Sequence, residues 1–178
     1  MPEHGPFVSR AARLFIRWFL VFLLGAFAGA ALSLCARAPL SVGRLPSDFR
    51  GAVRFFGTAC RSNAVLLAAA ALFMPSALCR SVLALGVLHK GAAFGCSLGM
   101  ASRGLLAVSH PVLVFLIYFA SCLLILALAS LTERLSAAVC RQASRPRRVL
   151  RLAGAYLCPW AVCSGGVFGL TLLGTCFL

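Results

Sequence analysis

A row of three glycines, spaced four residues apart, constrains this chain more than any other feature. Gly91, Gly95 and Gly99 lie in a largely apolar segment and would share one face of a helix. In water, a glycine inside a helix costs about 1 kcal/mol relative to alanine. In lipid, a row of small residues lets two helix backbones approach closely, and this contact drives helix association. The row therefore predicts a helix that packs against another helix within a membrane.

Two further rows have the same spacing, Gly25 with Gly29 and Ser33, and Gly165 with Gly169. Glycine is also commoner in membrane helices in general, and that alternative would remove the packing role but keep the helices in the membrane. We interpret all three rows as helix-packing faces.

The composition also indicates a membrane protein. The chain is 62% hydrophobic and 11% charged, with a mean hydropathy of +1.00, whereas apolar residues make up about half of a soluble domain. The sequence contains no polar or alternating block long enough for a water-soluble domain. We therefore expect an all-α fold, a polytopic integral membrane helix bundle, with residues 1–178 forming a single transmembrane domain.

Apolar runs in the sequence predict about five transmembrane helices, because about 20 apolar residues cross the hydrocarbon core. A turn is expected at His89 and Lys90, where the second span would end and the third begin. The second span contains Pro75 and is interpreted as one kinked helix, with a break near Arg80 as the alternative. The expected spans are approximately 14–34, 64–88, 91–109, 111–130 and 152–177.

The first span has one competing interpretation, a cleaved signal peptide. Basic residues precede it, and Ala36-Arg37-Ala38 follows it as a possible cleavage pattern. The apolar run is longer than a usual signal core and carries a glycine face, so we expect it to remain as a membrane helix.

The connector between the first two spans is too polar to cross the membrane. Pro46 and Ser47 read as a helix start, and apolar residues follow at helical spacing with arginines elsewhere around the helix. The pattern predicts an interfacial amphipathic helix at about 47–60, with a solvated basic loop as the alternative. The residues assigned to interfacial or partner contact are Phe49, Val53, Phe56, Asn63 and Lys90.

The net charge of +14 comes from 17 Lys and Arg against three acidic residues, and the cations cluster between apolar stretches. This distribution points to membrane topology and lipid headgroups rather than to nucleic acid. The arginine-rich stretch 131–151 is expected to be a cytoplasmic loop, which places the N-terminus in the cytoplasm and the C-terminus outside. The basic connector 35–63 then lies outside, which conflicts with the preference for positive charge in the cytoplasm. We base the orientation on the stretch 131–151, because its arginines are denser.

No catalytic, cofactor or metal site is expected. The nine cysteines form no C-x-x-C pair, and a disulfide between Cys35 and Cys60 stays open. The sequence contains no H-E-x-x-H motif and no paired aspartates, and His89 and His110 are interpreted as residues at helix ends. Enzyme function is therefore not expected.

Several features occur in one order along the chain. A first span of the type LLGAFAGA and a basic connector with Phe55-Phe56 precede Asn63 and an apolar span. The motif Lys90-Gly91-Ala92-Ala93-Phe94-Gly95, then Gly104 and a span that starts at Pro111, complete the order. From Leu23 to Ser130 the chain thereby resembles the bacterial stage II sporulation protein M family.

The resemblance implies a non-enzymatic membrane scaffold in a spore-forming bacterium. Such a scaffold would anchor peptidoglycan-degrading partners at the septal membrane during engulfment, with membrane lipids around it. The alternative is a small polytopic transporter, or a membrane subunit of a transport complex, because charge inside the membrane often marks a solute pathway. Only Arg80 is expected to lie deep enough for that role.

Overall fold

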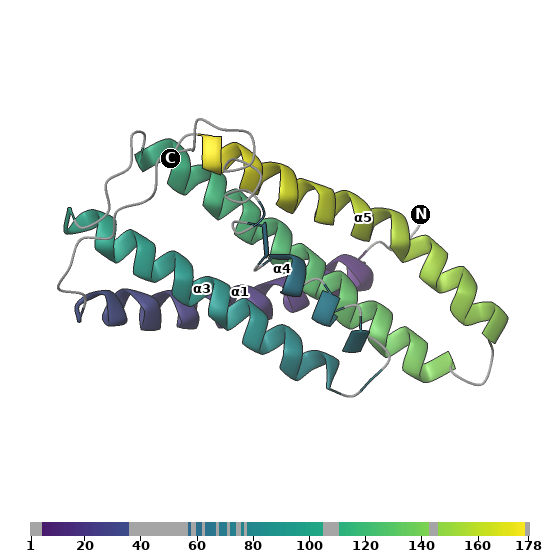
Figure 1. Ribbon diagram of the computed structural model, residues 1–178. Helices are drawn as coiled ribbons and strands as arrows, with labels where there is room; N and C mark the ends of the chain where they lie inside the picture. The colour runs from purple at the N-terminus through teal and green to yellow at the C-terminus, as the bar shows by residue number, and fades with distance from the viewer. Residues whose placement is uncertain are drawn as a thin grey trace.

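The computed structural model is almost entirely helical in the part of the chain that it describes (Figure 1). It describes residues 5–35, 57, 60–61, 63–66, 68–70, 72–73, 76, 78–104, 111–142 and 146–176. The helices with assigned bounds are α1 (Gly5–Ser33), α3 (Cys79–Ser102), α4 (Pro111–Gln142) and α5 (Pro146–Cys176).

Each of these helices contains a stretch long and apolar enough to cross a membrane. The stretches are Ala12–Ser33, Cys79–Ser102, Val112–Arg141 and Gly154–Leu173. Large apolar side chains cover much of the outer surface, among them Phe27 at 73% exposure and Leu85 at 68%. A water-soluble monomer rarely exposes so much contiguous apolar surface, whereas lipid accommodates it. The prediction of an all-helical fold is confirmed, and the four apolar helices support the prediction of a membrane protein.

Helices α1 and α3 form a close parallel pair (Figure 1). Residues later in α1 contact residues later in α3, as expected for parallel helices. Gly25 faces Leu88, Gly29 faces Ala92, and Ser33 faces Gly99. The core between the helices contains Trp18 and Phe22 from α1 and Leu83 and Val87 from α3, all nearly inaccessible.

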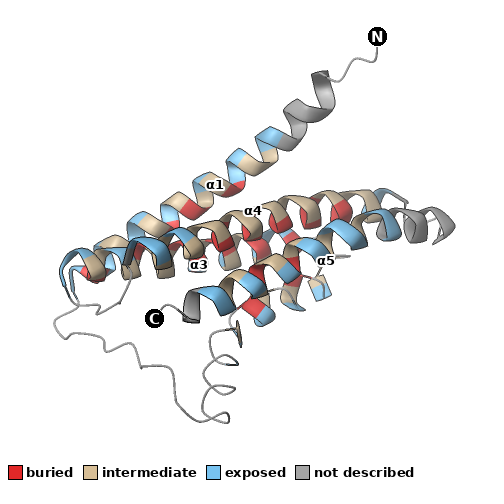
Figure 2. Ribbon diagram, turned by 90° about the horizontal axis from the view of Figure 1, so that it is seen from above, coloured by how far each residue is buried: buried red, intermediate tan, exposed pale blue. Residues whose placement is uncertain are grey.

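Helix α4 lies antiparallel to α3 and to α5. Phe94, in the second half of α3, packs on Tyr118 and Phe119 near the start of α4, while Arg80 at the start of α3 meets Glu133 late in α4. On its other side, α4 packs Ile125 and Leu128 against Val167 of α5. Helix α4 thus joins the α1–α3 pair to α5, which is mostly exposed (Figure 2).

The predicted turn at His89 and Lys90 is wrong. Helix α3 runs through both residues without interruption, so the expected spans 64–88 and 91–109 do not describe this region. Helix α3 begins earlier, at Cys79, whose amide donates a hydrogen bond to the Ser76 carbonyl. This start is one residue from Arg80, near which the sequence offers an alternative break. Histidine and lysine do not end a helix by backbone geometry, whereas Gly104 beyond its end has a positive φ of 67°.

The predicted loop at 131–151 is also wrong. Helix α4 continues to Gln142 and α5 begins at Pro146, so most of this arginine-rich stretch is helical. The helix continues because Leu135 and Ser136 keep a buried face beyond the apolar run. The core of the predicted interfacial helix, with Phe49, Val53 and Phe56, lies outside the described residues, and that helix stays a prediction.

Candidate functional site

A buried carboxylate joins three helices. Glu133 of α4 is 3% exposed, and its Oε2 accepts hydrogen bonds from Arg17 Nη2 at 3.0 Å and from the Trp18 indole Nε1 at 3.1 Å. Its Oε1 accepts a second bond from Arg17 Nη2 at 3.1 Å and lies 2.8 Å from Arg80 Nε. The carboxylate therefore links α4 to both members of the α1–α3 pair.

The two arginines and the tryptophan differ in their access to solvent. The side chains of Arg17 and Arg80 are 46% and 67% exposed, whereas Trp18 is 1% exposed. The Arg17 guanidinium also lies 5.0 Å from the centre of the Trp18 ring, a cation–π distance. Without the carboxylate, both arginines could turn to water or headgroups, but the indole N–H of Trp18 would lose its hydrogen-bond acceptor.

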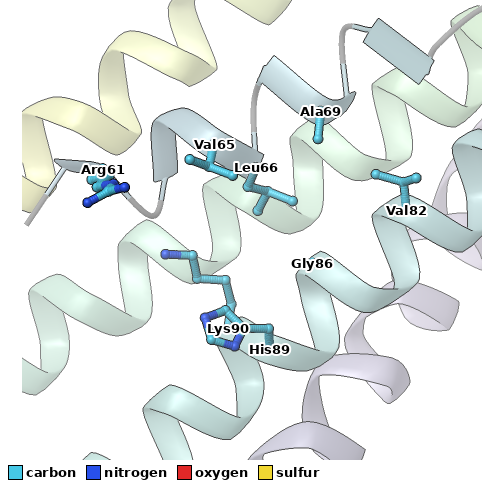
Figure 3. A pocket seen from close by; sticks show the side chains of 8 residues that line it. All are labelled: Arg61, Val65, Leu66, Ala69, Val82, Gly86, His89 and Lys90. Carbon is cyan, nitrogen blue, oxygen red and sulfur yellow. The ribbon is translucent and has the colours of Figure 1, made fainter.

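A second polar region lies beside α3, where a pocket of about 480 Å³ opens between α3 and the 57–78 segment (Figure 3). Its polar lining is basic, with Arg61 from the segment and His89 and Lys90 from α3. In Figure 3 the Lys90 side chain extends toward the side of the pocket where Arg61 lies. The apolar lining consists of Val65, Leu66, Ala69, Val82 and Gly86.

Lys90 lies near the middle of a candidate membrane span. It is 6% exposed, and the helical rise places it about 16 Å from Cys79 and about 18 Å from Ser102 along α3. The expectation that only Arg80 lies deep within the membrane is therefore wrong. An ionisable residue at such a depth is costly and is a functional-site candidate by default.

The predicted small-residue rows of α1 and α3 face each other. A Cβ atom added to Gly95 would lie 2.8 Å from the Ala26 Cα atom, and one added to Gly91 would lie 3.0 Å from the Ala26 amide nitrogen. On Gly29, the added atom would lie 2.8 Å from the Ala92 Cα atom. These backbones touch where any side chain would hold them apart. Gly25, Gly99 and Ser33 lie in the same contact.

The row on α5 is in a different environment. Gly165 and Gly169 are exposed, and an added Cβ atom on either glycine would meet nothing within 4 Å. Gly154, Cys158 and Ala161 are also exposed and lie on the same side of α5. The structure thus brings two rows together and leaves the third on the surface of this chain.

Asn63 links the 57–78 segment to α5. It is 6% exposed, and its Nδ2 donates to the Thr171 hydroxyl at 2.9 Å, which donates in turn to the Val167 carbonyl at 2.7 Å. Within the described residues, the Asn63 Oδ1 is buried without a hydrogen-bond partner. Asn63 is thus part of the helix packing in this chain, whereas the sequence predicts an interfacial or partner contact for it.

The sequence pattern does not single out Glu133. It follows the apolar run 111–130 by three residues, and its neighbour Arg134 favours a basic loop. For Lys90 the signal was its place between two apolar runs, which read equally well as a turn. The described residues contain no group of three or more histidine, cysteine or acidic side chains that could hold a metal ion.

No family model, no curated protein and no solved structure matches the chain. The fold and the site define a helical membrane protein in which a buried carboxylate, Glu133, pairs with Arg17 and Arg80, and in which a basic pocket lies beside α3.

Proposed function

We propose that the protein is a non-enzymatic membrane scaffold that binds partner helices through the exposed face of α5. The observation that carries the proposal is the contrast between its glycine rows. Gly91 and Gly95 are covered by the backbone of α1, whereas Gly165 and Gly169 meet nothing within 4 Å. Because small residues at this spacing let helix backbones touch, the open row suits a helix from another protein.

The partners are proposed from the resemblance to the stage II sporulation protein M family. It implies peptidoglycan-degrading enzymes, held at the septal membrane of a spore-forming bacterium during engulfment. The predicted interfacial helix at 47–60 would contribute a second contact near the membrane surface. Membrane lipids would surround the remaining apolar faces.

A bundle of five spans fits this role, and the direction of the helices supports that count. Because α1 and α3 run parallel, a chain that crosses the membrane in both must cross back between Ser33 and Cys79. The 57–78 segment is the candidate for this crossing, since Leu66 packs near Gly86 of α3 and Asn63 bonds to Thr171 of α5.

Charge supports one orientation of this bundle. Arg17, Arg80, Arg134 and Arg141 all lie toward the end of the bundle where α1 and α3 begin and α4 ends. The positive-inside preference favours that end in the cytoplasm. The N-terminus would then be cytoplasmic and the C-terminus extracytoplasmic.

The α5 face can be tested with a double variant, Gly165→Leu with Gly169→Leu. Leucines at the open positions should block a partner helix without disturbing the fold, so the melting temperature in detergent should stay near that of the parent. Cross-linking in the host followed by purification should then recover less peptidoglycan hydrolase, and engulfment should fail. The matched control is Ala155→Leu, which enlarges an exposed α5 residue ten positions, about 15 Å of helical rise, before Gly165.

Two outcomes would count against the proposal. Undiminished recovery of the hydrolases with the double variant would exclude the α5 face as their binding surface. Normal sporulation after deletion of the gene would exclude the septal scaffold itself.

A second candidate function is transport of an anionic solute, which the burial of Lys90 favours. Purified protein in proteoliposomes should then take up labelled phosphate by itself, and Lys90→Met should abolish the uptake. Uptake by the protein alone would favour transport over the scaffold.

A further inference from the structure

The pocket between α3 and the 57–78 segment concentrates positive charge. Arg61 is permanently cationic, and the consecutive residues His89 and Lys90 line the pocket from α3. Guanidinium and ammonium groups are the usual ligands of phosphate oxygens, and imidazole adds an N–H donor. The lining therefore offers donors from two separate parts of the chain to one anionic group.

The described residues that line the pocket include no carboxylate. Glu133, the acidic residue that the described ranges contain, is bound by Arg17, Arg80 and Trp18. Arg80 precedes Lys90 by ten residues on α3, about 15 Å of helical rise. A basic pocket with low-dielectric walls attracts an anion more strongly than the same charges would in water.

The remaining lining is apolar and partly open to the outside. Val65 is 61% exposed, and Leu66, Ala69 and Val82 continue the apolar wall. The volume of about 480 Å³ lies in the range of small-molecule sites, about 300–1,000 Å³. Inorganic phosphate would use the basic end and leave the apolar wall bare, whereas an acyl chain would cover that wall.

We propose that this pocket binds an anionic amphiphile, with its phosphate held by Arg61, His89 and Lys90. Its hydrocarbon chain lies along Val65, Leu66, Ala69 and Val82. This draws the phosphate toward the middle of α3, deeper than the headgroups of the surrounding bilayer. The site is independent of the α5 face and does not depend on the scaffold function.

The test measures the melting temperature of the full-length, delipidated protein in a neutral detergent. Phosphatidylglycerol, phosphatidylcholine and inorganic phosphate are added separately at equal concentrations. Phosphatidylglycerol well above its dissociation constant should raise the melting temperature by about 5 °C or more. Phosphatidylcholine and inorganic phosphate should each produce less than about half of that shift.

Variants then locate the effect. Arg61→Gln removes an exposed charge, so it should fold, and it should reduce the phosphatidylglycerol shift by at least about twofold. Lys90→Met should reduce it further, and Ala69→Phe should block the apolar wall while every charge remains. Arg141→Gln, which removes an exposed cation at the far end of α4, is the matched control and should keep the full shift.

Three results would overturn the inference. Equal shifts with phosphatidylcholine would mean that the headgroup charge is not recognised. An equal shift with inorganic phosphate would mean that the pocket binds a free anion and not an amphiphile. A full phosphatidylglycerol shift in both Arg61→Gln and Ala69→Phe would place the lipid elsewhere on the protein.

Discussion

Arg17 and Glu133 are 116 positions apart in the sequence, yet the Arg17 Nη2 lies 3.0 Å from one carboxylate oxygen of Glu133 and 3.1 Å from the other. The contact joins the first helix to the end of α4, and Arg80 completes it from the start of α3. Since the cluster lies where three helices meet, it fixes how far each is inserted relative to the others. Apolar packing alone specifies that register less sharply, because leucine and alanine contacts resemble one another at each turn.

Glu133→Ala should lower the stability of the protein more than Glu133→Gln. Alanine leaves the buried indole N–H of Trp18 without an acceptor, at a cost of about 1–3 kcal/mol. Glutamine keeps an acceptor for Trp18 and loses only the pairing with two exposed arginines. Thermal unfolding in detergent measures both variants.

One single variant, Arg17→Gln, serves as the comparison for Glu133→Ala. Arg17→Gln should cost less than Glu133→Ala, because Arg80 still pairs with the carboxylate. If Glu133→Ala melts with the parent, the cluster contributes nothing to stability and the indole has found another acceptor.

Gly95→Ala should destabilise the α1–α3 pair although it adds only a methyl group. The added Cβ atom would lie 2.8 Å from the Cα atom of Ala26, and backbone cannot move aside as a flexible side chain can. Overpacking of this kind costs about 1–3 kcal/mol. The loss should appear as a lower melting temperature in detergent.

Gly165→Ala is the matched control for Gly95→Ala, because an added Cβ atom there meets nothing within 4 Å. It should leave the melting temperature unchanged or raise it slightly through helix propensity. Equal destabilisation by both variants would mean that loss of glycine itself, rather than the helix contact, sets the cost.

The spacing of small residues was informative because close backbone approach needs it, and this signal is local. Gly25, Gly29, Gly91 and Gly95 could be assigned to helix faces from the sequence alone, although their partner helices could not. Glu133 could not be assigned, since its partners are more than 50 residues away in the sequence. A charge between two apolar runs reads as the end of a span until its partners are known.

The burial of Lys90 is a second feature that the sequence pattern does not predict. In the sequence, a histidine and a lysine between apolar runs predict a turn, because exposing a charge to lipid is costly. In the structure, the lysine is buried beside a pocket and the helix continues. Periodicity therefore located the apolar faces, but burial of a polar residue depends on tertiary contacts that periodicity does not contain.

Asn63→Leu should weaken the attachment of the 57–78 segment to α5. It removes the hydrogen bond from Nδ2 to Thr171, and such bonds between membrane helices contribute about 0.6 kcal/mol on average and up to about 1.7 kcal/mol. Thr171→Val should have a similar effect, and the double variant should cost no more than the larger single change. Costs that simply add would show that the two side chains act independently.

Cys35 and Cys140 provide a test of sidedness, because both are exposed and they lie at opposite ends of the bundle. Two variants, each keeping one of these cysteines and replacing the other eight, are treated in intact cells with a membrane-impermeant thiol reagent. With the arginine-rich end in the cytoplasm, the reagent should label Cys35 and miss Cys140 until the cells are permeabilised. Labelling of both after permeabilisation is the control for reactivity. If Cys140 is labelled in intact cells and Cys35 is not, the bundle has the opposite orientation, and the exposed α5 face would approach its partners with the C-terminus in the cytoplasm.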